Sequence, residues 1–129
     1  MYYQAEVILP RGMTESDPQR QTLRLAKGFI THMLVGFPPG CQALARLQVF
    51  DKGWQLLPWT PGQSLGWDNV MLNFPFTYPL QVEPFEVVIR AWNLDDSYEH
   101  TLTVGVTMDE GQHDRGWLEF LQQLKEASV

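Results

Sequence analysis

Short runs of alternating apolar and polar residues, interrupted by proline and glycine, constrain the fold of this chain most strongly. In residues 2–9, apolar Tyr3, Ala5, Val7 and Leu9 fall on one side of a period-two pattern. That period is typical of a half-buried β-strand. Similar runs occupy residues 28–37, 43–50, 54–57, 70–76, 85–92 and 100–108, with a short edge strand at 22–25. Nine prolines and ten glycines punctuate the chain, a pattern that predicts an antiparallel β-sandwich of jelly-roll or immunoglobulin-like type.

Two of these runs carry further information. Residues 28–37 are largely apolar on both faces, which predicts a central strand covered on each side. Residues 43–57 contain Asp51-Lys52-Gly53 between two strand candidates, and a glycine at that spacing predicts a hairpin turn. Residues 93–97, Asn-Leu-Asp-Asp-Ser, are predicted to form another turn because Asn and Asp side chains bond their own backbone.

The spacing of the apolar residues changes from the period of a strand to that of a helix only near the end of the chain. Trp117, Phe120, Leu121 and Leu124 follow the i, i+3, i+4, i+7 spacing of an amphipathic helix over residues 115–126. So short a helix must dock its apolar face, either on its own sheet or on a neighbouring subunit. We therefore expect a single domain over residues 1–129, with the sandwich in 1–110 and one C-terminal helix.

The charge balance narrows the range of partners. The chain has 9 Lys and Arg against 15 Asp and Glu, a net charge of −6, and its basic residues form no cluster in the sequence. Direct nucleic-acid binding is therefore not expected, nor is an anionic membrane surface. Neither a membrane-spanning apolar run nor a secretory leader is recognisable, so the chain is expected to be soluble and made inside a cell.

Residue types that commonly serve in catalysis or metal binding do not cluster in the sequence. Cys41 is the one cysteine, which excludes an intrachain disulfide and a cysteine-based zinc site, and a buried thiol is the expectation for it. His32, His100 and His113 lack the short spacing of metal ligands. We therefore expect no catalytic residue, cofactor or metal. An enzyme would require His32 and His100 to converge with a carboxylate in one pocket.

The segment from Trp54 to Trp67 is the most distinctive loop. Trp54, Trp59 and Trp67 lie within it among prolines and glycines. Three roles remain open for these rings: a lid on the core, a protein interface, or a platform on which sugars stack.

Several short motifs carry a resemblance to a known class of proteins. They are Gly28-Phe29-Ile30, Phe37-Pro38-Pro39-Gly40, Leu57-Pro58-Trp59, Ala91-Trp92-Asn93-Leu94-Asp95 and the run from Tyr98 to Val104. The stretch from Gly28 to Met108 resembles small virion proteins of tailed bacteriophages. The resemblance implies a capsid decoration, cement or other accessory head protein that is made in the host bacterial cytoplasm and located in the virion.

The resemblance also implies partners. These are the chain itself, as a homo-oligomer with a trimer expected, and the major capsid protein or another virion protein. The expected interface residues are Trp59, Trp67, Trp117, Phe120, Leu121 and Leu124. The alternative function is a carbohydrate- or receptor-binding β-sandwich module that uses the Trp54–Trp67 loop.

Overall fold

The computed structural model describes residues 1–109 and contains eight β-strands in that range. The strands are β1 (Tyr2–Leu9), β2 (Gln19–Arg24), β3 (Gly28–Phe37), β4 (Ala45–Asp51), β5 (Trp54–Leu57), β6 (Val70–Leu80), β7 (Glu86–Asn93) and β8 (His100–Asp109). The predicted helix over 115–126, with Trp117, Phe120, Leu121 and Leu124, lies outside the described residues. Within residues 1–109, no helix has the length and apolar character needed to cross a membrane.

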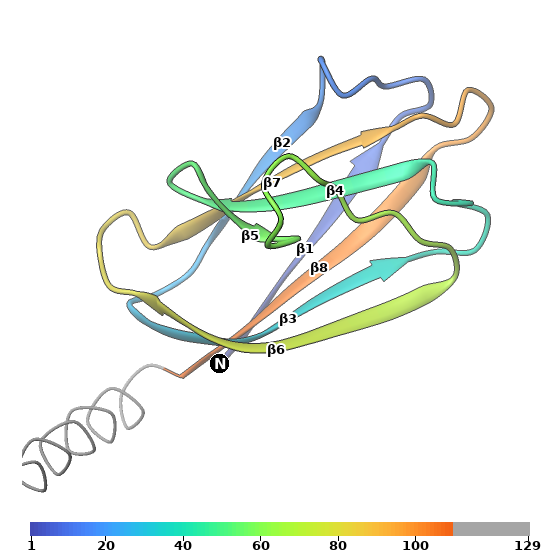
Figure 1. Ribbon diagram of the computed structural model, residues 1–129. Coiled ribbons are helices and arrows are strands. Elements are labelled where there is room, and N and C mark those ends of the chain that lie inside the picture. The colour runs from blue at the N-terminus through green and yellow to red at the C-terminus, as the bar shows by residue number, and fades with distance from the viewer. Residues whose placement is uncertain (110–129) are drawn as a thin grey trace, which may run out of the picture.

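The strands form two antiparallel sheets of four strands each (Figure 1). One sheet has the order β1-β8-β3-β6 and the other the order β2-β7-β4-β5. Strand β1 pairs with β8 along its full length, from Tyr2 opposite Thr107 to Leu9 opposite His100. Among the eight described strands, only β4 and β5 are neighbours both in sequence and in a sheet. Chain order therefore alternates between the two layers.

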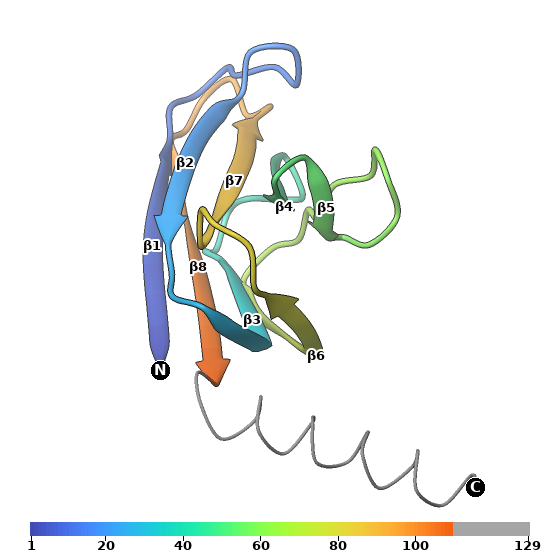
Figure 2. The same ribbon diagram turned by 90° about the vertical axis from the view of Figure 1, so that its left-hand side faces the viewer.

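The two sheets enclose a shared apolar core, which makes the fold β-sandwich-like (Figure 2). Inward side chains from both layers contribute to it, and their burial supplies the main favourable term in folding. Its largest fully buried members are Leu9, Ile30, Met33, Leu47, Leu56, Leu80, Ile89 and Leu102. The mostly β fold predicted from the sequence is thus confirmed.

The period-two patterns correctly predicted which face of most strands is buried. In β1, Val7 and Leu9 have no exposed surface, whereas Gln4 and Glu6 face outward. In β8 the alternation from His100 to Met108 is likewise retained. Gly105 on the outer face is nevertheless buried, because the Tyr2 ring lies over it.

The prediction for residues 28–37 was correct in part. Strand β3 does lie between two others, β8 and β6. A register shift between Ile30 and His32 changes the face on which side chains point, so that both Phe29 and Ile30 are buried and His32 is exposed. A bulge inserts one unpaired residue and has this effect. The outer face of β3 is therefore not fully covered within the described part of the chain.

The predicted hairpin is confirmed. Strands β4 and β5 are joined by Lys52 and Gly53, which have φ angles of 49° and 86°. Two consecutive residues with positive φ are typical of a type I′ turn, whose twist matches that of the strands. The turn places Trp54 directly at the start of β5.

Candidate functional site

The segment between β5 and β6, residues 58–69, is hydrogen-bonded along the outer edge of β4. Leu65 exchanges two backbone hydrogen bonds with Leu47, at 2.9 and 3.0 Å. The Gln55 side chain donates to the carbonyls of Pro58 and Gln63 at 2.7 and 2.9 Å and accepts from the Gly62 amide at 3.1 Å. These bonds replace the regular pairing that the segment lacks, and they fix the position of its aromatic residues.

All three tryptophans of this segment are exposed. Trp54, Trp59 and Trp67 expose 62%, 61% and 53% of their surface. The possibility that they form a lid on the core is therefore wrong. Large rings displayed in this way mark binding sites more often than singly scattered apolar residues do.

The structure brings two of these tryptophans together and separates the third. Trp54 and Trp59 line one concavity of about 440 Å³ with Phe50, Gly53, Gln55 and Pro61. Trp67 instead accepts a backbone hydrogen bond from Ala43, before the start of β4. Strand β4 runs from that end to the Trp54 end and spans about 20 Å at 3.3 Å per residue. The loop thus contributes to two different sites.

The first site is an open groove on the outer face of the β2-β7-β4-β5 sheet. It has a volume of about 710 Å³, and its lining includes Phe50, Val88, Arg20 and Glu86. It shares Phe50, Gly53 and Gln55 with the concavity of Trp54 and Trp59. The two hollows therefore adjoin each other. A volume of several hundred cubic ångströms is typical of small-molecule sites.

The floor of this groove is a hydrogen-bonded network. Arg90 donates to Gln48 Oε1 at 2.7 Å and to the Glu15 carbonyl at 2.6 Å, and its guanidinium stacks 5.0 Å from the centre of the Trp92 ring. Gln48 in turn donates to the Gln63 carbonyl at 2.8 Å. These contacts keep the floor polar and rigid. This network was not predicted from the sequence, although Arg90 and Gln48 are polar residues at outward positions of otherwise apolar strands.

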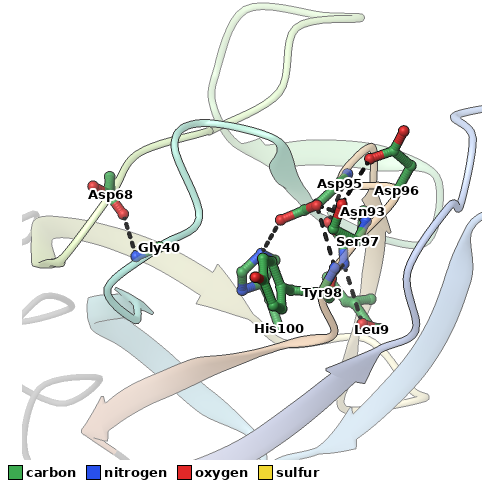
Figure 3. A network of polar contacts seen from close by, with 9 residues as sticks. All are labelled: Leu9, Gly40, Asp68, Asn93, Asp95, Asp96, Ser97, Tyr98 and His100. Carbon is green, nitrogen blue, oxygen red and sulfur yellow. Dashed lines mark hydrogen bonds and ion pairs between the residues drawn. The ribbon is translucent and has the colours of Figure 1, made fainter.

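The second site is the end of the sandwich where the 38–44, 65–70 and 93–99 loops meet (Figure 3). We call it the loop end. The Gly40 amide donates to Asp68 Oδ1 at 2.8 Å, and the Leu94 amide donates to the Leu44 carbonyl at 2.9 Å. Each outer loop is therefore tied to the central 38–44 loop.

The 93–99 loop is stabilised by a buried polar cluster. The Asn93 side chain donates to the carbonyls of Leu9 and Tyr98, at 3.3 and 2.9 Å. One Asp95 oxygen accepts from the amides of Ser97 and Tyr98, and the other lies 2.8 Å from His100 Nε2 (Figure 3). These bonds from Ser97, His100 and Tyr98 lower the pKa of Asp95 below its ordinary 3.8. The predicted turn at 93–97 is confirmed, but its link to His100 was not foreseen.

Cys41 lies inside the loop end and is fully buried, as the sequence led us to expect. Burial, with the nearby carboxylates of Asp68 and Asp95, raises its pKa to about 11. The thiol is therefore protonated at neutral pH. A thiol is a poor nucleophile in that state, because the thiolate is the reactive form.

Three large apolar side chains project from the loop end into solvent. Trp67, Leu94 and Tyr98 are about half exposed or more, and Tyr98 reaches 69%. Tyr98 and Leu44 line one concavity of about 600 Å³ with Pro39 and His100. The backbone beneath these side chains is fixed by the bonds described above.

The histidine pair that an enzyme would require does not converge. His100 pairs with Leu9 at the start of β8, whereas His32 pairs with Thr107 at its other end. Among residues 1–109, no group of three or more His, Cys, Asp or Glu side chains is placed to hold a metal ion.

Comparisons with protein-family models, curated proteins and solved structures returned no match.

Proposed function

We propose that this chain is a structural protein of a tailed-phage virion, a capsid decoration, cement or other accessory head protein that acts by assembly rather than catalysis. The observation that carries the assembly role is the rigid display of Trp67, Leu94 and Tyr98 at the loop end. Exposed aromatic anchors on a fixed backbone are typical of protein interfaces, because little conformational entropy is lost when they bind.

We also infer that the sandwich is of the jelly-roll type. Strands that are consecutive in sequence lie in opposite sheets except for β4 and β5. Immunoglobulin-like sandwiches differ, since they place consecutive strands A and B in the same sheet. Eight strands in two four-stranded sheets fit a double-sheet jelly roll, an architecture used by viral capsid and lectin domains. This inference supports the virion assignment, which otherwise rests on the sequence resemblance.

The proposed partners are a second copy of the chain, with a trimer expected, and the major capsid protein. Interfaces between capsid-bound copies add avidity to weak individual contacts. Of the predicted interface residues, Trp67 lies at the loop end, whereas Trp59 lies beside the groove, so we assign the assembly contact to Trp67 and its neighbours.

The assembly role is tested by the native mass of the full chain, measured by light scattering across a dilution series. We expect a closed oligomer that Trp67→Ala converts to monomers. Trp54→Ala is the matched control, because Trp54 is equally exposed but distant from the loop end, and it should leave the mass unchanged. A monomer at every concentration would overturn self-assembly.

The virion assignment has its own test. Mass spectrometry of purified particles of a phage whose genome encodes this chain should detect its peptides in stoichiometric amount. Their absence from intact particles would contradict the assignment, whatever the oligomeric state.

A second candidate function is favoured by a separate observation. Trp54 and Trp59 line one concavity, which adjoins the groove that contains Arg20, Gln48 and Glu86. Paired exposed aromatic side chains next to polar groups are suited to stacking and hydrogen-bonding a sugar. A carbohydrate- or receptor-binding module would use this surface and not the loop end.

A further inference from the structure

We propose that the groove on the β2-β7-β4-β5 sheet binds an acidic oligosaccharide, with sugar rings stacked on Trp54 and Trp59 and a sugar carboxylate held by Arg20. This inference rests on the second candidate function above and assigns the ligand class. Three features of the surface carry it: its charge, its fixed aromatic end and its volume.

The charge of this face is opposite to that of the whole chain. Cross-strand pairing places Arg20 opposite Arg90, Arg24 opposite Glu86 and Arg46 opposite Trp92, all on the outer side of the sheet. Four of the chain's six arginines thus share one face of a protein with a net charge of −6. Two carboxylates, Glu15 and Glu86, line the same groove. A locally positive surface favours an anionic ligand.

Arg20 is the arginine best placed to contact such a ligand. Its side chain is exposed and lines the groove, whereas Arg90 is held by Gln48 and the Glu15 carbonyl. A guanidinium binds carboxylates through two parallel hydrogen bonds. Arg90 therefore shapes the floor, and Arg20 is available to the ligand.

The aromatic end of the groove distinguishes a sugar from a simple anion. Trp54 and Trp59 present flat apolar surfaces, and the Gln55 hydrogen bonds fix the loop that carries Trp59. A sugar has both an apolar ring face for such stacking and hydroxyls for Glu86 and the amides of the groove. A volume of about 710 Å³ exceeds the needs of an inorganic anion and suits a ligand of several rings.

The experiment titrates the full chain with trigalacturonate as the acidic probe and with maltotriose as the neutral one, followed by tryptophan fluorescence and calorimetry. We expect trigalacturonate to bind and maltotriose to bind at least tenfold more weakly. Arg20→Gln and Trp54→Ala should each raise the Kd for trigalacturonate about tenfold. Both residues are exposed, so circular dichroism should report an intact fold for each variant.

The possible outcomes distinguish an acidic sugar ligand from a carbohydrate site in general and from the assembly role of the loop end. Trp67→Ala should change the native mass and leave trigalacturonate binding within about twofold. Equal binding of both sugars would overturn the acidic ligand while retaining a carbohydrate site. No binding of either sugar at millimolar concentration would overturn the carbohydrate site altogether. Tighter binding of an oligothymidylate or of an oligoglutamate peptide would also overturn the proposal, in favour of another polyanion.

Discussion

The Tyr78 hydroxyl donates a 2.5 Å hydrogen bond to Asp51 Oδ2 and so connects β6 of one sheet to the end of β4 in the other. Asp51 is buried and its second oxygen accepts from Lys52 Nζ at 3.0 Å. The contact is a polar link across the sandwich edge, next to the β4–β5 turn that precedes Trp54. It therefore helps to position the aromatic end of the groove.

Removing this link should destabilise the fold. Tyr78→Phe leaves a buried carboxylate without one of its partners, and we expect a loss of about 1–2 kcal/mol in the free energy of unfolding. Urea denaturation at neutral pH measures it. Tyr98→Phe is the control, because its ring is exposed, and a loss as large in that variant would contradict the explanation.

The same hydrogen bond makes the stability of the fold depend on pH in the alkaline range. Burial, the hydrogen bond to Asp51 and its negative charge raise the pKa of Tyr78 from 10.0 to about 12 in the folded chain. The unfolded chain therefore releases this proton first, and the contribution of Tyr78 to stability is complete below pH 10 and is lost as the pH rises toward 12. Thermal melts from pH 9 to 12 should fall more steeply for the wild type than for Tyr78→Phe. Parallel slopes would argue against this assignment.

At acidic pH, the ionisation state of Asp95 should determine how stable the loop end is. Because its pKa is lowered in the folded chain, the ionised carboxylate stabilises the fold above pH 3.8, and this contribution is lost as the pH falls through the folded-state value. Melting temperatures measured between pH 6 and 2.5 should decline less for Asp95→Asn than for the wild type. Asp96→Asn serves as a matched control on an exposed carboxylate and should follow the wild-type curve.

The Cys41 thiol should be inert in the native chain. Burial and a pKa raised to about 11 keep it protonated and inaccessible. Ellman's reagent should therefore react slowly at pH 8 and release one equivalent only after denaturant is added. Rapid reaction without denaturant would mean that the 38–44 loop opens readily, and the rigid loop end on which assembly depends would be lost.

Gln55 should determine the order of the tryptophan loop. Gln55→Ala removes the bonds to Pro58, Gln63 and Gly62, and we expect faster proteolytic cleavage within residues 58–64, because loops without such bonds open locally. Gln19→Ala, an exposed glutamine on β2, is the control. An unchanged cleavage rate in Gln55→Ala would show that the Leu65–Leu47 bonds are sufficient to hold the loop.

The sequence by itself determined where most strands begin and end and which faces they bury. A period of two requires no knowledge of neighbours, and a turn such as Lys52-Gly53 is set by residues adjacent in the chain. Hence the buried faces of β1 and β8 and the β4–β5 hairpin were predictable. The bulge in β3 was not, because no local pattern marks it.

Only the tertiary structure decided which strands are neighbours, and with that the two candidate sites. Arg20 and Arg90 are 70 positions apart and form no basic cluster in the sequence, yet the pairing of β2 with β7 places them side by side. The strand order likewise keeps His32 and His100 apart at opposite ends of β8, and the course of the loop along β4 separates Trp67 from Trp54 and Trp59. Such pairings follow from the joint burial of a core shared by two sheets, a long-range property that no window of the sequence contains.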